Sequence, residues 1–547
     1  MGILSWHHVA LAAIAFFMLR ITRQLLKRSP VDNLPGPPRK TFLYGNVTQI
    51  FGNRFAFDYH REVIYKYGPV AKIYGFLGAP PLIYVFDPKA LQHIVVKDQY
   101  IYEASSRFLQ LNRVLFGEGL LSSTGEQHKH QRKLLNPVFN SSNIRSMTPI
   151  FYRVTHKMRE AVTRQVNNGE SEIDMLNWVT RVALELIGQG GLGHSFDPLD
   201  KPGINEFAED VKALMPTLLP LAVLTQFLPI ATKIGTPSFR RRVVELFPNK
   251  FVQRSREISD AFYQTSRTIL QQKKKALAEG DEAVSKQVGE GKDIMSVLLR
   301  ANMTASAEDK MSDDELLGHM SQLIFTGMET TSGALARILH LLAQHQDVQR
   351  RLRQEIRAAK KEYGDEDIPY DALFSLPYLE AVCREALRLY SPLTTMNKVA
   401  REDIVLPFST PIRGEDGSMM TEVLVPKGTA VIVGLWASNI NPALWGEDAE
   451  VYKPERWLQP LPETVTDAHI PGLYTHLMSF LGGGRACIGF KFSQLEMKVV
   501  LSVLIDTFQF DLPKDKEIYW NSAGIQYPSI GRESCKSELP LQVSLVQ

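Results

Sequence analysis

A glycine-rich stretch, Phe480–Phe490 (FLGGGRACIGF), contains Cys487, one of three cysteines that lie far apart in the chain. A thiolate is a strong ligand for iron or zinc. Zinc would need three more ligands at close spacing, and no C-x-x-C or nearby histidine pair is present. A nucleophile would need a neighbouring base, and a phosphate loop would need Lys followed by Ser or Thr after the glycines. An axial thiolate to haem needs only one cysteine, and glycines let the backbone approach a flat ring.

A carboxylate and several hydroxyls lie within a second, otherwise apolar stretch, LIFTGMETTSGAL. It belongs to a segment, Ser312–Gln344, whose capping box and periodicity predict one long helix. Glu329 and Thr330 lie in its middle, where a buried carboxylate is costly unless it is used or paired. Because Gly327 weakens the helix, we expect a bend or an opened turn with room for a small ligand. A back-bonded threonine in an ordinary core helix is the alternative.

Glu385 and Arg388 are three residues apart on one face of an amphipathic helix, predicted between Pro377 and Pro392. On the surface such a pair contributes little to stability. If it is buried, it fixes the local geometry and needs further partners. Arg456, in the stretch PERW, is one available partner.

The elements that must position these residues are mostly helices. Helical periodicity dominates the middle and C-terminal half, and strand-like runs occur at PVAKIYGFL, PPLIYVF and EVLVPKGTAVIVG. The predicted fold is therefore mainly α with a small β portion. A helix over Phe490–Thr507 would begin just after Cys487, where free N–H groups and the helix dipole favour a thiolate.

The N-terminal residues predict a membrane anchor. Ile3–Leu19 is mostly apolar and four basic residues follow, so residues 3–22 are expected to form a transmembrane helix with the following chain in the cytosol. A cleaved signal peptide is disfavoured because no basic segment precedes the run and no small-residue cleavage site follows it. Residues 29–40 predict a proline-rich hinge, and residues 41–547 a single large domain.

A second apolar segment, Leu214–Ile230, carries no charge over 17 residues. Pro216, Pro220 and Pro229 argue against a regular membrane span. A surface segment that dips into a bilayer and a plain core helix both remain open.

The gross composition excludes some classes of protein. A formal net charge of +3 over 547 residues gives no support for nucleic-acid binding. Three scattered cysteines are not a disulfide framework, which favours a reducing compartment.

The motifs together resemble the cytochrome P450 family. FLGGGRACIG matches its cysteine loop, Phe-x-x-Gly-x-Arg-x-Cys-x-Gly; EALR matches its Glu-x-x-Arg helix, PERW its arginine-containing meander and TGMETT its oxygen-binding helix. The motifs occur in the family order, and the resemblance covers about residues 31–530. The anchor and hinge look like those of microsomal members. The insert LPFSTPIRGEDGSMMTEVLVPKGT and the approach to the cysteine loop look like those of fungal members.

The resemblance implies a P450 fold and a role for each matching residue. Cys487 would be the axial ligand of heme b, Phe480 would pack beside it, and Gly489 would let the next helix start close to the haem. Glu329 and Thr330 would be the acid–alcohol pair that relays protons to dioxygen. The haem propionates would be met by Arg132, Lys398 and Arg485, and the buried ion network would consist of Glu385, Arg388 and Arg456.

Two positions depart from the family pattern. HKHQR stands where the family usually has Trp-x-x-x-Arg, so His128 is the candidate replacement for the tryptophan's hydrogen bond to a propionate. A metal pair of His128 and His130 is the rival interpretation. Thr326 replaces the usual small Ala or Gly, which would narrow the pocket or add a hydroxyl near the iron.

The resemblance further implies a haem-thiolate monooxygenase of the endoplasmic reticulum membrane. It would insert one oxygen atom into a small lipophilic substrate (a terpenoid, steroid, fatty acid or polycyclic aromatic) in fungal secondary metabolism or xenobiotic oxidation. Electrons would come from NADPH-cytochrome P450 reductase, with cytochrome b5 as a further donor. A basic patch of Lys129, Lys133 and Lys491 is a candidate docking surface, against the alternative of ordinary solvated charges.

Two rival functions remain. A haem-thiolate isomerase or dehydratase would need no reductase, but it would also have no need of Glu329 and Thr330. A membrane-anchored haem sensor would bind a ligand without turnover. Consumption of NADPH with a purified reductase separates both from the monooxygenase.

Overall fold

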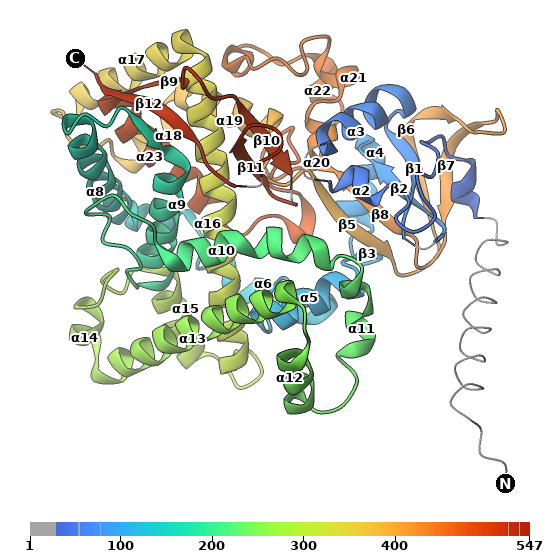
Figure 1. Ribbon diagram of the computed structural model, residues 1–547, viewed down its shortest axis with the longest axis horizontal. Coiled ribbons are helices and arrows are strands. Elements are labelled where there is room, and N and C mark those ends of the chain that lie inside the picture. Colours follow the sequence, from blue (N-terminus) through green and yellow to red (C-terminus); the bar gives the residue numbers. More distant parts are fainter. Residues whose placement is uncertain (1–28, 53–54, 77, 523, 535, 547) are drawn as a thin grey trace. The chain divides into compact units, whose positions relative to one another are not determined.

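The computed structural model describes residues 29–52, 55–76, 78–522, 524–534 and 536–546, which divide into two compact units (Figure 1). The first unit contains the described residues up to Glu103, with Thr395–Gly446 and Thr464–Gly484. The second unit contains Ala104–Thr394, Glu447–Glu463 and the chain from Arg485 onward. The transmembrane helix predicted at residues 3–22 lies outside the described residues.

A five-stranded sheet forms the core of the first unit, in the order β1–β2–β8–β5–β3. Strands β2 and β8 are parallel, and Ile83 pairs with Val431 between them, with both side chains fully buried. The predicted strand runs are confirmed, because β-branched side chains fill this sheet. The strands of this unit are β1 (Val70–Tyr74), β2 (Pro81–Val85), β3 (Tyr102–Glu103), β5 (Thr395–Ala400), β8 (Ala430–Gly434), and the separate hairpin of β6 (Ile404–Arg413) and β7 (Met419–Val425).

Short helices complete the first unit: η1 (Pro30–Asn33), α2 (Val47–Ile50), α3 (Ala56–Glu62), η2 (Val63–Tyr67), α4 (Pro88–Gln92), η3 (His93–Lys97), α20 (Leu435–Asn439), α21 (Pro442–Trp445) and most of α22 (Glu463–Thr466).

The predicted hinge begins as a packed segment. Ser29 caps η1 through a capping box, and Val31 and Leu34 are fully buried. From Leu34 to Lys40 the chain is not helical, as its prolines require. Residues from Ser29 onward therefore belong to the packed part of the first unit.

Helices dominate the second unit. They are α5 (Ser106–Phe116), α6 (Gly125–Leu135), α7 (Ser141–Ser146), α8 (Thr148–Asn167), α9 (Met175–Leu186), η4 (Ile187–Leu192), α10 (Glu206–Leu218), η5 (Leu219–Leu221), η6 (Leu224–Phe227), α11 (Leu228–Ala231), α12 (Pro237–Leu246), α13 (Lys250–Glu279), α14 (Asp281–Ser285), α15 (Ile294–Thr304), α16 (Asp313–Gln344), α17 (Gln346–Glu362), α18 (Tyr370–Ser375), α19 (Pro377–Leu389), η7 (Pro454–Leu458) and α23 (Phe490–Thr507), with η8 (Gly483–Arg485) at its boundary.

Two small sheets complete the second unit. Strand β12 (Pro540–Leu545) lies between β4 (Glu172–Asp174) and β9 (Phe508–Asp511), and its Leu541 pairs with Ile173. Strands β10 (Ile518–Ser522) and β11 (Gln526–Ile530) form a separate antiparallel hairpin. The prediction of a mainly α fold with a small β portion is confirmed.

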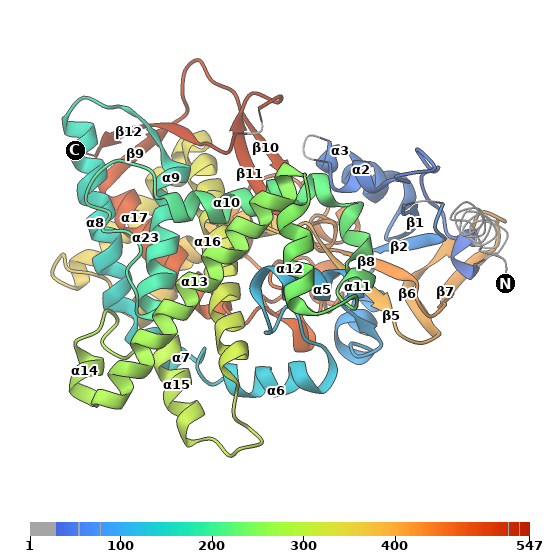
Figure 2. The same ribbon diagram turned by 60° about the horizontal axis from the view of Figure 1, so that its bottom comes forward.

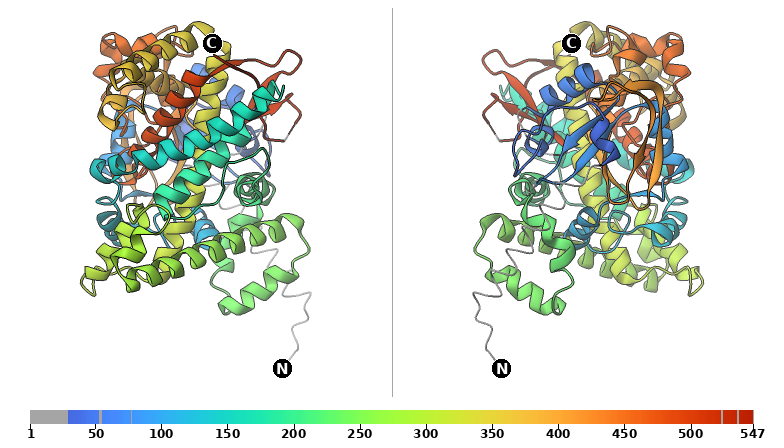
Figure 3. Two further views of the ribbon diagram at one scale, coloured as in Figure 1. Left: turned by 90° about the vertical axis from the view of Figure 1, so that its left-hand side faces the viewer. Right: turned by 90° about the vertical axis from the view of Figure 1, so that its right-hand side faces the viewer.

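The long helix α16 is the core helix of the second unit and contacts α9, α19 and α23. Every residue from Ala334 to Ala343 of this helix is buried, so neighbouring elements cover this part of α16 on all sides. Figure 2 shows α13 crossing α16, and Figure 3 shows α8 beside α23. The predicted capping box at Ser312 is confirmed.

The opened turn considered at Gly327 is absent, because α16 is a continuous α-helix through this residue. A Cβ at Gly327 would lie 2.9 Å from Cγ1 of Ile187 in η4. The irregular turn belongs to the neighbour instead: η4 is a π-helical turn that continues α9. Gly327 therefore permits close packing of η4 against α16.

The apolar segment Leu214–Ile230 folds as the end of α10 followed by η5, η6 and α11. Pro216 lies inside α10, whereas Pro220 and Pro229 occupy first turns of later elements. Among the described helices, none alone has the length and apolar character of a membrane span. Glu206–Leu221 and Leu224–Ala231 pass that test only together, across a bend of 81°.

Candidate active site

Cys487 lies in the loop just before α23, as the sequence predicted. Gly489 is the N-cap residue of α23, and a Cβ on Gly489 would be 4.0 Å from the Sγ of Cys487. The backbone N–H of Gly489 donates a hydrogen bond to this sulfur. The sulfur therefore lies at the positive end of a helix of 18 residues.

The protein groups around Cys487 do not by themselves stabilise its thiolate form. Burial raises its pKa, and the N–H of Gly489 and the guanidinium of Arg132 oppose this rise without cancelling it. The residue nevertheless keeps accessible surface, although protein surrounds its sulfur. A metal ion bound to this sulfur would reverse the balance, because a coordinating thiol is deprotonated.

Two arginines flank the cysteine loop within the second unit. Arg132 extends from α6 and donates from Nη1 to the carbonyl oxygen of Ala486 at 2.9 Å. Arg485 donates from Nη1 to Leu120 O at 3.2 Å and from Nη2 to Ser123 O at 2.9 Å. Burial lowers the pKa of Arg132, Cys487 opposes this effect, and the charge of Arg485 adds to it. Two mutually repelling cations beside one sulfur are suited to bind an anionic group.

Phe480 and Lys398 belong to the first unit. The ring of Phe480 contacts that of Tyr474 edge to face, with centroids 5.9 Å apart. Lys398 lies in β5 opposite Val431 of β8, and it is buried. Their contacts with the haem remain predictions.

Glu329 and Thr330 are neighbours on α16. Glu329 keeps some accessible surface, but protein surrounds it and burial raises its pKa to about 7. Thr330 Oγ1 donates to Thr326 O at 2.8 Å, and Thr326 Oγ1 donates to Gln322 O at 2.7 Å. The alternative of a back-bonded threonine is therefore correct for the hydroxyl protons of both threonines, whose lone pairs remain acceptors.

Sequence reasoning missed two charged residues of α10 that act on Glu329. Lys212 lowers its pKa, and Glu209 raises it. The two side chains form an ion pair at 3.9 Å, in which Lys212 is 14% and Glu209 51% exposed. Their spacing of three residues marks one helix face, but nothing in the sequence indicated that this face is turned toward α16.

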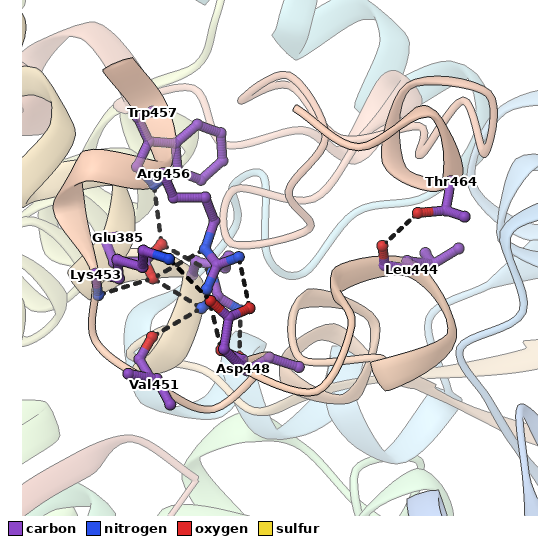
Figure 4. Close-up of polar contacts among 10 residues, drawn as sticks. Glu385, Leu444, Asp448, Val451, Lys453, Arg456, Trp457 and Thr464 are labelled. Carbon is purple, nitrogen blue, oxygen red and sulfur yellow. Dashed lines mark hydrogen bonds and ion pairs between the residues drawn. The ribbon is translucent and has the colours of Figure 1, made fainter. Parts of the chain in front are cut away.

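Glu385 is the centre of a buried ion network (Figure 4). Arg388 donates to it twice, from Nε and Nη2, each at 2.8 Å. Arg456 Nε donates to Glu385 Oε1 at 3.4 Å, and its Nη1 donates to Asp448 at 3.0 Å. The Nε1–H of Trp457 donates to Glu385 Oε2 at 2.9 Å. The structure thus brings together the three predicted residues and adds Asp448 and Trp457.

Backbone groups of the same segment complete this network. Lys453 N donates to Glu385 Oε1 at 3.2 Å, and Arg388 Nη1 donates to Ala449 O at 2.6 Å. Trp457 adjoins Arg456 in sequence and could have been included. No sequence pattern indicated Asp448, because its contact with Arg456 depends on the path of the backbone through residues 447–457.

Each lysine of the predicted basic patch has a partner. Lys129 pairs with Glu126 at 2.6 Å, Lys133 with Asp309 at 3.3 Å, and Lys491 donates to Ser141 Oγ at 2.5 Å. His130 also faces Asp309, at 3.8 Å. Within the described ranges, no group of three or more His, Cys, Asp or Glu side chains is arranged to hold a metal ion.

Comparison with known proteins identifies similar chains. The model of the family "Cytochrome P450" matches residues 35–525. Cytochrome P450 monooxygenase 91 of Postia placenta is 55% identical over 539 residues, which cover 98% of each chain. Cytochrome P450 monooxygenase 81 of the same fungus is 49% identical over 98% of this chain and 97% of its own. The ganoderic acid synthetase of Ganoderma lucidum is 45% identical over 538 residues, 98% of each chain.

Proposed function

Because this chain belongs to the cytochrome P450 family and is a monooxygenase with a cysteine-ligated haem, we propose that Cys487 is the axial ligand of that haem. The observation that carries the proposal is the convergence of Cys487, Gly489, Arg132 and Arg485 within one unit. Protein surrounds the sulfur while the residue keeps accessible surface, and burial raises the pKa of the thiol, so a bound metal cation would be needed to hold it as a thiolate.

The residues present fit a haem. A porphyrin carries two carboxylates, and Arg132 and Arg485 place two cations next to the cysteine loop. The network of Glu385, Arg388 and Arg456 fixes the segment around residue 450 against α19. We assign these three residues to holding the haem-binding core, and we keep Phe480 and Lys398 as proposed haem contacts.

We assign Glu329 and Thr330 of α16 to proton transfer. When bound, the haem iron activates dioxygen and supplies the oxidising power. Thr330 Oγ1 donates its one hydrogen bond to Thr326 O. Its lone pairs therefore remain to accept a hydrogen bond from an incoming proton donor. The carboxyl of Glu329 gains and loses a proton near neutral pH, which suits a general acid–base group. The charges of Lys212 and Glu209 act on this carboxyl, and because Glu209 is half-exposed we assign the pair to the proton path to solvent.

The proposed substrate is a small lipophilic molecule of the terpenoid, steroid, fatty acid or polycyclic aromatic class. The similarity to the ganoderic acid synthetase supports a role in fungal secondary metabolism, with xenobiotic oxidation as the other setting. Apolar side chains on α5 and α16, including Phe116 and Phe325 with ring centroids 5.2 Å apart, support a lipophilic substrate.

The proposed electron donors are NADPH-cytochrome P450 reductase and cytochrome b5, at the endoplasmic reticulum membrane. The apolar run Ile3–Leu19 with its basic flank supports a single-pass anchor. Exposed Phe227, Ile230 and Phe239 support a second, peripheral contact with lipid. A chain that starts at Ser29 keeps the capping box and buried Val31, so it is expected to bind haem while it loses firm membrane attachment.

Turnover with purified reductase tests the function. The haem-loaded full chain, reductase and NADPH are incubated with a panel of lipophilic compounds under isotopically labelled dioxygen, and products are read by mass spectrometry. A product that carries one labelled oxygen atom supports the proposal. Conversion without NADPH would indicate an isomerase or dehydratase, and tight binding without any conversion across the panel would indicate a sensor.

A further inference from the structure

Beyond Thr330, α16 carries a buried arginine between two aromatic rings. The Cζ atom of Arg337 lies 3.9 Å from the ring centroid of Tyr390 and 3.6 Å from that of Trp520. Tyr390 caps the end of α19, and Trp520 belongs to β10. Arg337 is 8% exposed, and a guanidinium stacked on two rings gains cation–π energy that partly offsets its desolvation. The arginine thus joins α16, α19 and the β10–β11 hairpin.

Gln526 extends this contact to the chain that follows α19. Its Oε1 accepts from Arg337 Nη2 at 3.3 Å, and its Nε2 donates to Ser391 O at 2.7 Å. The backbone N–H of Gln526 donates to Pro392 O at 3.1 Å, and Ile525 forms a β-bridge with Leu393. The start of β11 and residues 391–393 are therefore held together, and Arg337 anchors the pair to α16.

His340, one turn along α16, supports the same arrangement. Trp520 Nε1 donates to His340 Nδ1 at 3.0 Å. Burial, and then the charge of Arg337, lower the pKa of His340 to about 3, so the ring stays neutral and its Nδ1 accepts. The indole is thus fixed by a hydrogen bond while its face covers the guanidinium.

The anchored segments lie beside the proposed oxygen site. A Cβ on Gly333 would be 3.6 Å from the carbonyl oxygen of Gln526, and Gly333 is three residues after Thr330 on the same helix face. At the turn of the hairpin, Gly524 has φ +88°, and a Cβ there would be 2.9 Å from Cε of Met215 in α10. Gly524–Gln526 therefore lie between α10 and the turn of α16 that carries Thr330 and Gly333.

We propose that Arg337 is a positioning residue for substrate selection: through Trp520, Tyr390 and Gln526 it fixes Gly524–Gln526 and residues 391–393 as one wall of the pocket next to Thr330. The proposal rests on the proposed function for the meaning of that pocket. An isolated two-stranded hairpin is only marginally stable, and within the described chain β10 and β11 pair only with each other. Anchoring by α16 thus decides how far Gly524–Gln526 reach toward the substrate.

The test compares Arg337→Met and Arg337→Lys with a control, Arg353→Met. Arg353 is also a buried arginine, but it holds Ile505 O at 2.7 Å and Phe508 O at 2.9 Å, where α23 joins β9. Two readouts are taken on the haem-loaded full chain. Hydrogen exchange is measured over residues 518–530, and binding of 1-phenylimidazole and of clotrimazole is followed by the haem spectrum. The first ligand is small, and the second is bulky enough to reach the pocket wall.

In Arg337→Met the hairpin amides should exchange about tenfold faster, as expected for the loss of one charge-assisted hydrogen bond. The ratio of clotrimazole to 1-phenylimidazole affinity should change by about fivefold or more, while 1-phenylimidazole affinity stays within about twofold. Arg337→Lys keeps the cation over the rings and should restore part of both effects. Arg353→Met should lower the melting temperature and leave the affinity ratio unchanged.

An unchanged affinity ratio in Arg337→Met, or an equal change in Arg353→Met, would overturn the proposal and leave Arg337 a purely structural residue. If Arg337→Met fails to fold, Trp520→Phe provides the same test, since it removes the hydrogen bond to His340 and keeps an aromatic face. Neither readout requires turnover, so failure of the monooxygenase assay and failure of this proposal are distinguishable.

Discussion

Thr330 Oγ1 lies 2.8 Å from the carbonyl oxygen of Thr326, to which it donates its proton. The hydroxyl is therefore oriented by its own helix, with its lone pairs turned away from that carbonyl. In the proposed function, Thr330 would therefore act as an acceptor that holds a proton donor in place, and Glu329 would be the group that exchanges protons.

Replacing Thr330 tests this role. In Thr330→Ala the acceptor is lost and the fold should survive, because alanine is a good helix former. We expect normal NADPH oxidation with at least about tenfold less product per NADPH and more hydrogen peroxide, since acid–base assistance is typically worth about 10²-fold or more. Thr330→Ser should recover part of the product yield.

Thr331→Ala is the matched control, because Thr331 is 4% exposed and points about 100° away around the helix. Product, peroxide and NADPH are measured for all three variants. Unaltered product per NADPH in Thr330→Ala would refute the role of this hydroxyl.

Glu329 predicts a pH-dependent stability. The pKa of Glu329 rises from 4.5 in the unfolded chain to about 7 in the folded chain. The contribution of Glu329 to the free energy of unfolding is therefore highest below pH 4.5, where the carboxyl is neutral in both states, and it falls as the pH rises through 7. Glu329→Gln should therefore exceed the wild-type free energy of unfolding by about 1 kcal/mol or less at pH 5 and by up to about 3 kcal/mol at pH 8. Urea denaturation at pH 5, 6, 7 and 8 measures the difference.

Two variants on α10 should shift the pH range over which Glu329 loses stability, in opposite directions. Lys212 lowers the pKa of Glu329, so Lys212→Met should move the window to higher pH. Glu209 raises the pKa, so Glu209→Gln should move it to lower pH. A stability difference that is independent of pH in all these variants would contradict the assignment.

The Glu385 network predicts a steep loss of stability. Glu385→Ala leaves Arg388 buried without its carboxylate, and removal of one partner of a buried pair costs about 3–5 kcal/mol. We expect little soluble haem-loaded protein from this variant. Asp448→Asn is the control: Asp448 is 40% exposed and pairs with Arg456 and Lys453, and Arg456 keeps its contact with Glu385, so this change should cost about 1 kcal/mol or less. Equal yields of the two variants would show that the network is not essential.

Cys487 predicts a spectroscopic change. Cys487→His should remove the red-shifted carbon monoxide band of a thiolate-ligated ferrous haem. Cys383→Ala, at the buried cysteine of α19, should retain it. A Cys487→His protein that keeps the band would assign the ligand to another residue.

Local sequence patterns predicted much of the fold and those site contacts that join residues close together in the sequence. Phe490–Thr507 and the helix capped by Ser312 were predictable because apolar period and capping chemistry are local. The Glu385–Arg388 contact follows from a spacing of three residues on one helix.

Other contacts depend on which faces meet across the fold. No pattern in the sequence indicates that Gly327 permits packing against Ile187, or that Lys212 and Glu209 act on Glu329. The same holds for Arg337, which joins partners more than 50 and more than 180 residues away. Such contacts depend on tertiary packing, which the hydrophobic periodicity of a single segment does not reveal.

The sheet of β4, β12 and β9 has a consequence for synthesis of the protein. Leu539 N donates to Asp174 Oδ1 across 365 residues of chain, and Leu541 pairs with Ile173 just beyond. At a translation rate of about 5–20 residues per second, β4 waits roughly 20–70 s for its partner strand. During that interval Ile173 and the neighbouring apolar face of α9 lack their native cover, so the nascent chain is a natural client for ribosome-associated chaperones.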